Sequence, residues 1–406
     1  MDNNTTLKRT LSLPQMVLYG LGTTVGAGIY ALIGELAGIS GYLAPTSFLF
    51  AAILAGLTAL SFAELSCRYP RAAGAALYTQ QGFHSHHLTL IIGLLVILAG
   101  LVSSAALINA FSGYLNQLIA IDNSSSIILV TLLLTSIAVY GIAQSVFLAS
   151  LITLIEVGGL IWIIFISQGA IAQLPEIGTL LIPEFNLTSL SIIFTGTLLA
   201  FYAFIGFEDM VDVAEEVQDV KRNLPLAILI TLGITTILYM LIMTLAVLSI
   251  PPQELAQSSA PLATLFTLHT GKSAEIISLI SILAIINGSL IQIIMASRVI
   301  YGLSYRHQLP ALLSYIHPKT QTPIIATLLA GLTVMTLALI GHLSTLAEIT
   351  SFLMLIVFSI VNLSLWRIKQ TEPIIEGCIS LPRYVALLAF ISSTSFVIIS
   401  IYSRLA

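Results

Sequence analysis

The chain has 406 residues, of which 57% are hydrophobic and only 8% are charged, and its mean hydropathy is +1.04. A soluble domain is normally about 25% charged, so this composition excludes a soluble protein and indicates a membrane protein with many spans. The net charge of −4 says little about partners, because the placement of basic residues matters more than their sum. Two cysteines, Cys67 and Cys378, predict neither a disulfide framework nor a metal site. Lys8 and Arg9 precede a long apolar segment without a small-residue cleavage site, so we expect a retained span and no signal peptide.

Apolar windows of about 20 residues, the length that crosses a bilayer, predict eleven spans after an N-terminal tail at 1–13. Turn-forming residues such as Pro251-Pro252 separate the spans. The spans are expected at 14–38, 43–66, 88–118, 127–142, 146–168, 191–217, 226–250, 275–304, 323–341, 347–366 and 383–403.

The basic residues orient these spans. With the N-terminus inside the cell, every lysine and arginine except Lys272 and Arg404 falls in an inner loop or near an inner helix end. Positive charges are enriched in cytoplasmic loops. We therefore expect a cytoplasmic N-terminus in a bacterial-type plasma membrane, and the odd number of spans places the C-terminus outside.

The first span contains two closely spaced glycines, Gly26 and Gly28, in its middle. Each glycine inside a helix costs roughly 1 kcal/mol relative to alanine, and main-chain groups freed within a membrane must find partners. We expect a short unwound segment whose amides, at the start of the second half-helix, favour an anion. Close helix packing through small residues is the alternative interpretation.

The sixth span is interrupted at Gly206, inside the run F-Y-A-F-I-G-F-E. Acidic residues follow, and Glu208 and Asp209 suit the first turn of a half-helix, where capping is their simplest role. Glu208, Asp212 and Glu215 also share one face of an α-helix. We interpret this face as an acidic stripe that leads toward the cytoplasm and solvates a widening inner mouth.

The two interruptions lie about 180 residues and five spans apart. An odd shift reverses the direction of the chain in the membrane. Residues 14–168 and 191–366 are therefore expected to be two inverted five-helix repeats with matching broken helices, and the span at 383–403 lies outside them. This arrangement is typical of secondary transporters whose site lies between the breaks.

Six stretches of the sequence form specific motifs. They lie at 22–30 (GTTVGAGIY), 63–74 (AELSCRYPRAAG), 111–115 (FSGYL), 201–208 (FYAFIGFE), 214–225 (AEEVQDVKRNLP) and 296–303 (ASRVIYGL). Over nearly its whole length the chain thereby resembles the amino acid–polyamine–organocation superfamily, and the SGYL and IGFE pieces are similar to bacterial relatives of cationic amino acid transporters. The resemblance implies an all-α polytopic membrane protein with the LeuT-type 5+5 inverted repeat, discontinuous helices 1 and 6, and an eleventh span where the family usually has twelve or more.

The resemblance also implies which groups hold an amino acid. The α-carboxylate meets the first helix, at positions that correspond here to Thr24, Gly26, Ala27 and Gly28. The α-amine meets main-chain oxygens before the second break, which correspond to those of Phe201, Ala203 and Phe204. This agrees with helix-end chemistry, since N-terminal amides suit an anion and C-terminal carbonyls suit an ammonium. Main-chain recognition of this kind predicts amino acids broadly.

Glu156 lies deep in the fifth span, where a carboxylate is costly and usually faces a cavity with a functional role. In sodium-independent relatives a lysine at this position is thought to replace a sodium ion, so a glutamate reverses the sign. A carboxyl binds either a proton or a sodium ion, and the alternative is a protonated acid hydrogen-bonded to a carbonyl. We expect Glu156 to couple or regulate transport.

Several other polar side chains have either a functional role or a role in helix packing alone. Tyr202 falls where relatives place an aromatic gate, and Asn109 and Gln292 are nominated as substrate contacts, although interhelical hydrogen bonding is the default for both. Ser289 is a candidate ion ligand, and it joins Glu156, Glu208 and Tyr202 as a coupling or gating residue. Glu64 and Arg68, four residues apart, form an ordinary helical pair with a structural gating role.

The sequence as a whole predicts a permease for amino acids that works by alternating access, with proton symport favoured over sodium. Two alternatives stay open: an ion-independent exchanger of amino acids or amines, and a receptor that binds an amino acid without moving it. We expect no enzyme activity, no cofactor, no metal and no nucleic acid. The partners are an amino acid, a proton and the lipid bilayer, and a small membrane subunit or a homodimer is left open. The nominated pocket residues are mostly neutral, which favours neutral or broad selectivity.

Overall fold

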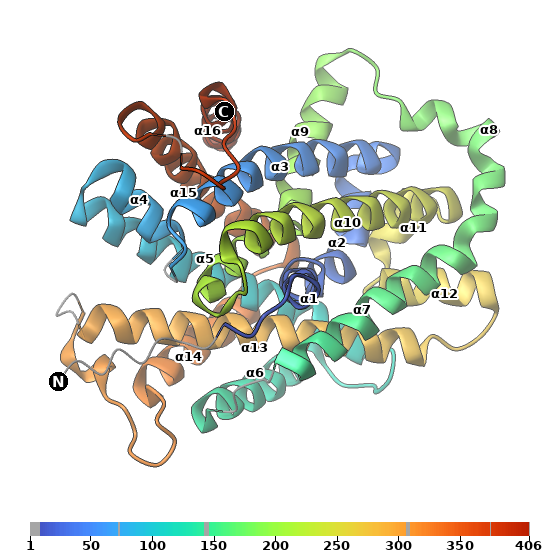
Figure 1. Cartoon of the computed structure of the whole chain (residues 1–406). Helices are drawn as coiled ribbons and strands as arrows, with labels where there is room; N and C mark the ends of the chain where they lie inside the picture. Colours follow the sequence, from blue (N-terminus) through green and yellow to red (C-terminus); the bar gives the residue numbers. More distant parts are fainter. Residues whose placement is uncertain (1–8, 72–73, 142–145, 306–308, 374, 406) are drawn as a thin grey trace.

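The computed structural model describes residues 9–71, 74–141, 146–305, 309–373 and 375–405, and helices dominate it (Figure 1). The α-helices are α1 Leu13–Thr24, α2 Gly26–Ser40, α3 Ala44–Arg68, α4 Gly74–Phe83, α5 His86–Leu115, α6 Asn123–Tyr140, α7 Val146–Ser167, α8 Leu174–Ile177, α9 Leu187–Tyr202, α10 Val220–Ser249, α11 Pro252–Gln257, α12 Pro261–Thr270, α13 Glu275–Tyr305, α14 Ile324–Ile340, α15 Leu343–Thr371 and α16 Arg383–Leu405. The 3₁₀ segments are η1 Gly41–Leu43, η2 Gln168–Gln173, η3 Gly178–Leu181, η4 Phe207–Glu216 and η5 Ala311–Ser314.

The predicted spans coincide with these helices. Within the described residues, nine helical segments are long and apolar enough to cross a membrane, and the first of them, Gly28–Arg68, covers parts of two predicted spans. The span predicted at 323–341 corresponds to the shorter apolar helix α14. The prediction of an all-helical, multi-pass membrane protein is therefore confirmed.

Helices α1 and α2 form the centre of the bundle. In Figure 1, α1 lies among α3, α10, α7 and α13, and α1 packs against α10 and α7 while α2 packs against α9, α11 and α13. Ile29 and Leu36 of α2 are fully buried. At the periphery, α6 exposes Leu129 and Leu133, which are 60% and 54% accessible, so its apolar face suits a hydrocarbon environment.

The end of α3 is fastened to the segment that joins α15 to α16. Cys67 and Cys378 form a disulfide with Cα atoms 5.6 Å apart. The expectation of no disulfide was wrong, because this pair is separated by 311 residues and sequence spacing does not reveal it. The predicted Glu64–Arg68 pair is confirmed at 2.9 Å, and Lys369 of α15 adds a second cation whose Nζ donates to Glu64 Oε2 at 2.7 Å.

Candidate functional site

The interruption of the first span is a single residue. Helix α1 ends at Thr24 and α2 begins at Gly26, and Val25 between them keeps helical angles of φ −68° and ψ −48°. The expectation of an unwound segment around Gly26 to Gly28 was therefore wrong: both glycines belong to α2, and the Val25 N–H still donates to the Leu21 carbonyl at 2.7 Å. Only the backbone of Gly26 and Ala27 lies within the described part of the chain. Fewer main-chain amides are freed here than the sequence suggested.

The interruption of the sixth span is wider and lies where the glycine predicted it. Helix α9 ends at Tyr202, a turn follows, and η4 begins after Gly206. Gly206 has a φ of +122°, a region that side chains disfavour. The Gly206 N–H donates to Glu208 Oε2 at 2.8 Å, which confirms the capping interpretation of Glu208.

The two interruptions are in direct contact. The Thr23 hydroxyl donates to the Gly206 carbonyl at 2.9 Å, and a Cβ atom on Gly206 would lie only 2.3 Å from the main-chain oxygen of Thr23. On the other side, a Cβ atom on Gly28 would lie 2.9 Å from Cα of Ala203. Glycine at these positions therefore allows the two main chains to meet, and at Gly28 this agrees with the alternative interpretation, close packing through small residues.

Two of the three carbonyls expected to hold an ammonium group, those of Phe201 and Ala203, already have partners in this structure. The Phe201 carbonyl accepts from the Phe204 N–H at 3.0 Å. The Ala203 carbonyl accepts from the hydroxyl of Tyr239 at 2.9 Å. Sequence reasoning missed Tyr239, although a hydroxyl in the middle of the apolar seventh span was a signal that it would seek a buried acceptor.

Glu156 of α7 faces the first interruption. It is fully buried, and neither carboxyl oxygen has a hydrogen-bond partner among the described residues. Gly22 of α1 packs on Thr153, since a Cβ atom there would lie 2.3 Å from Thr153 Oγ1, and the Tyr30 hydroxyl of α2 donates to the main-chain oxygen of Glu156 at 2.6 Å. Residues three apart share a helix face, so Glu156 lies beside the first span between Gly22 and Tyr30. A buried carboxyl in such a place is costly unless it is protonated or binds a cation.

A cavity of about 620 Å³ lies among η4, α4, α5, α13 and α15. Arg298 of α13 also lines it, but acidic side chains of η4 dominate the charge of its wall. In a 3₁₀ helix residues three apart are eclipsed, which brings Asp209 and Asp212 to the same side. The predicted stripe of Glu208, Asp212 and Glu215 assumed α-helical spacing and was wrong on this point, because Glu208 is not part of this three-residue repeat. Glu215 does follow the repeat, but it is not among the residues that line the cavity. The acids of the wall are Glu208, Asp209, Asp212 and Glu216.

Two other nominated residues lie at or near this cavity. Gln292 lines it and packs on α5, where a Cβ atom on Gly100 would lie 2.8 Å from Gln292 Oε1. Tyr202 is 4% exposed, and its hydroxyl lies 3.1 Å from the hydroxyl of Ser103, a residue of the cavity wall. The predicted aromatic gate is thus hydrogen-bonded to α5 in this conformation.

The remaining nominated residues lie elsewhere. Asn109 donates from Nδ2 to the carbonyl of Ala338 at 2.9 Å, an interhelical bond between α5 and α14. Ser289 is fully buried, and its hydroxyl has no partner in the part of the chain that the structure describes. Its carbonyl accepts from Ser104 at 3.3 Å, which fastens α13 to α5.

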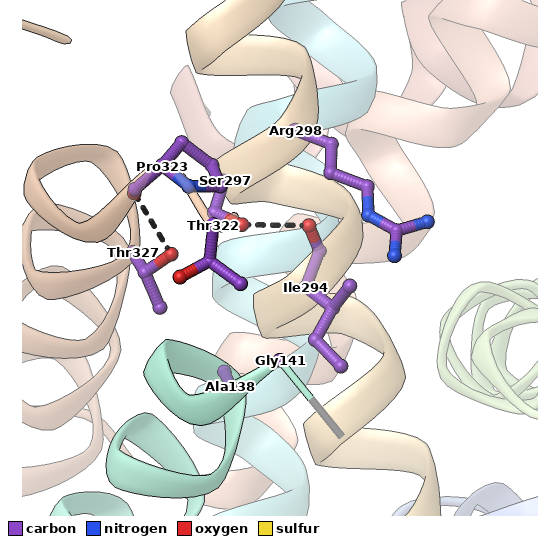
Figure 2. Close-up of a pocket in the computed structure, with 8 residues that line it drawn as sticks. All are labelled: Ala138, Gly141, Ile294, Ser297, Arg298, Thr322, Pro323 and Thr327. Atoms are coloured by element: carbon purple, nitrogen blue, oxygen red, sulfur yellow. Dashed lines mark hydrogen bonds between the residues drawn. The ribbon is translucent and has the colours of Figure 1, made fainter. Parts of the chain in front are cut away.

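Figure 2 shows a second cavity, of only about 40 Å³, between α6, α13 and the start of α14. The Ser297 hydroxyl donates to the Ile294 carbonyl at 2.8 Å, and the Thr327 hydroxyl donates to the Pro323 carbonyl at 3.0 Å (Figure 2). Because both hydroxyls bond within their own helices, we interpret this space as a packing gap.

The fold and the site define a class: a helical multi-pass membrane protein in which two interrupted spans meet beside an acid-lined cavity. Residues 11–404 match the amino acid permease family. The chain therefore belongs to this family, whose members are permeases and not enzymes, and the resemblance stated from the motifs is confirmed.

Individual relatives agree with this membership. The chain is 26% identical to the mitochondrial cationic amino acid transporter 3 of Arabidopsis thaliana over 90% of this chain and 63% of that protein. It is 24% identical to the branched-chain amino acid permease BcaP of Bacillus subtilis (90% and 82% covered), and 24% identical to the methylthioribose transporter of the same organism (95% and 87%). The chain spans about three fifths of the length of the plant and mammalian cationic amino acid transporters it matches.

Proposed function

We propose that this chain is a secondary active transporter that moves an amino acid together with a proton across a bacterial-type plasma membrane. The observation that carries the proposal is the direct contact between the two interruptions, where Thr23 bonds to the Gly206 carbonyl at 2.9 Å. Interrupted helices that meet inside a bundle are the usual setting of a substrate site in secondary transporters.

The proposed mechanism is alternating access between two inverted repeats, residues 14–168 and 191–366, with 383–403 outside them. The cavity wall includes Gly74 and Glu216, which lie close in sequence to Arg71 and to Lys221 at the start of α10. If these basic residues are on the cytoplasmic side, the N-terminus is cytoplasmic too, and the cavity opens inward. The structure then corresponds to an inward-facing conformation.

The proposed coupling residue is Glu156. Its carboxyl is buried beside the first interruption and has no partner among the described residues, which supports a role in taking up a proton or, as a second choice, a sodium ion. Ser289 has an unpaired buried hydroxyl in the same described set, and we propose it as a further ligand only for the sodium alternative.

The proposed substrates are amino acids with a positive charge or a net charge of zero. The relatives named above carry cationic amino acids, branched-chain amino acids and methylthioribose according to their names, so their names do not select one substrate. The acids of η4 in the cavity wall favour a ligand that carries an ammonium group and disfavour anionic amino acids. Gln292 and Tyr202 are the proposed side-chain contacts, and Thr24 and Gly28 flank the proposed carboxylate position.

The test is uptake by the purified protein in proteoliposomes. A thermal-shift screen over the standard amino acids and common polyamines first selects the probe, with L-lysine and L-leucine as the starting radiolabelled substrates. Symport predicts accumulation driven by an acidic exterior. The ion-independent exchanger is identified by two results together. Counterflow is as fast at clamped pH as it is in a pH gradient, and the pH gradient drives no accumulation. Binding without uptake in either assay identifies the receptor.

A further inference from the structure

Tyr239 of α10 reaches both interruptions at once. Its hydroxyl lies 3.0 Å from the carbonyl oxygen of Thr24, 3.3 Å from that of Val25 and 2.9 Å from that of Ala203. Thr24 and Val25 are the last residue of α1 and the residue that interrupts the first span, and Ala203 directly follows α9. A single side chain from a third helix therefore contacts main-chain carbonyls of both spans at their interruptions.

These carbonyls need a donor. Thr24 and Ala203 stand at the C-terminal ends of α1 and α9, where the last carbonyls have no partner within their own helix, and an unsatisfied polar group in an apolar interior is destabilising. Val25 is the N-cap residue of α2, so its carbonyl also accepts the first bond of that helix. Tyr239 is fully buried, so its hydroxyl bonds to these carbonyls within the core. A phenol has one hydrogen, so the three carbonyl oxygens share a single donor. All three lie close together around the Tyr239 hydroxyl.

The position of the hydroxyl is fixed by packing. The Tyr239 ring lies 5.5 Å from the ring of Phe48 on α3 and 5.2 Å from that of Phe204. Phe204 follows the end of α9, so both the ring and the hydroxyl of Tyr239 contact the second interruption. Because the ring is packed and the hydroxyl is hydrogen-bonded, the Tyr239 side chain holds the two interruptions at a defined spacing.

We propose that Tyr239 is a positioning residue that joins the two interruptions through its hydroxyl, so that they keep one mutual spacing and move as one unit. The inference rests on the proposed function for its consequence in transport, since a substrate held between the interruptions depends on their spacing. The shared hydrogen bonding of Tyr239 to the carbonyls of residues 24, 25 and 203 is independent of the proposed function.

The variant Tyr239→Phe removes the hydroxyl and keeps the packed ring. Tyr114→Phe is the matched control, because Tyr114 is equally buried and its hydroxyl donates to one main-chain carbonyl, that of Tyr30, at 2.8 Å. Incorporation of 4-aminophenylalanine at position 239 restores a donor at the same place and is the rescue variant.

The first measurement is amide hydrogen exchange of the substrate-free protein in detergent. Tyr239→Phe is expected to accelerate exchange in peptides covering 22–29 and 203–210 together, with the rest of the chain unchanged and with the rescue variant close to wild type. Acceleration in one of these segments alone, or uniformly over the chain, overturns the proposal. If Tyr239→Phe does not fold, the rescue variant is compared with 4-methylphenylalanine at the same position, and equal exchange in those two also overturns it.

The second measurement is uptake of the radiolabelled amino acid chosen by the thermal-shift screen. Tyr239→Phe is expected to raise KM roughly threefold to tenfold, the range of one hydrogen bond, while Tyr114→Phe stays within about twofold of wild type. A change in kcat at constant KM contradicts the positioning role. If wild type transports nothing, the proposed function fails, and the exchange experiment still decides the role of Tyr239.

Discussion

Replacing Glu156 by glutamine separates proton coupling from substrate movement. Glutamine has the size of the protonated acid but cannot release a proton, so Glu156→Gln mimics one state of the proposed cycle permanently. Glu156 is one carboxyl and binds one proton. For a substrate without net charge, a transmembrane difference of one pH unit supplies about 1.4 kcal/mol and supports at most about a tenfold accumulation. In the variant this ratio is expected to fall to about one.

The assay is uptake into proteoliposomes with an acidic exterior, with the membrane potential set to zero by valinomycin and equal potassium on both sides. Counterflow of the same amino acid in Glu156→Gln is expected to persist, because exchange needs no net proton transfer. The control is Glu254→Gln, since Glu254 is exposed in α11. Accumulation and a pH profile unchanged from wild type in Glu156→Gln would refute the coupling role.

Two substitutions and one labelling experiment test the architecture. Gly206→Ala places a Cβ 2.3 Å from the Thr23 oxygen at a φ of +122°, so we expect a loss of about 1 to 3 kcal/mol and of uptake. Gly302→Ala, where a Cβ meets no atom of the described residues within 4 Å, serves as the control in thermal unfolding. Glu64→Gln leaves two buried cations without their anion, and we expect a destabilisation of about 3 to 5 kcal/mol in the same assay. For Cys67 and Cys378, in protein purified under oxidising conditions because cytoplasmic thiols are kept reduced in the cell, we expect no maleimide labelling of the denatured, unreduced protein and labelling at both after reduction. Labelling before reduction shows that the pair is open.

Much of the fold follows from the sequence because the bilayer restricts the solutions. A chain that crosses hydrocarbon must satisfy its main chain internally, so long apolar windows predict helices such as α5 and α10 directly. Gly206 was equally predictable as a break, because a positive φ at a helix interruption calls for glycine. Glu208 follows from the same local logic, since an acid next to a freed amide caps it.

The parts that were missed depend on contacts between distant segments. Tyr239 acts on carbonyls more than 30 residues away in sequence, Lys369 meets Glu64 from another helix, and the disulfide joins residues 311 positions apart. One local error arose because the helix type differs from the one expected. A stretch such as 207–216 reads as an α-helix, but it folds as a 3₁₀ helix, and this changes which acids share a face.

Helix α1 connects the proposed coupling residue to the cavity. It packs against α7 on one side and η4 on another. Gly22 contacts Thr153, one turn before Glu156, whereas Tyr19 lines the acid-walled cavity. Gly22 and Tyr19 are three residues apart in one helix, so a shift of α1 relative to α7 also moves Tyr19 in the cavity wall. We therefore propose that a change in the charge of Glu156 affects the substrate through α1, without direct contact between the two.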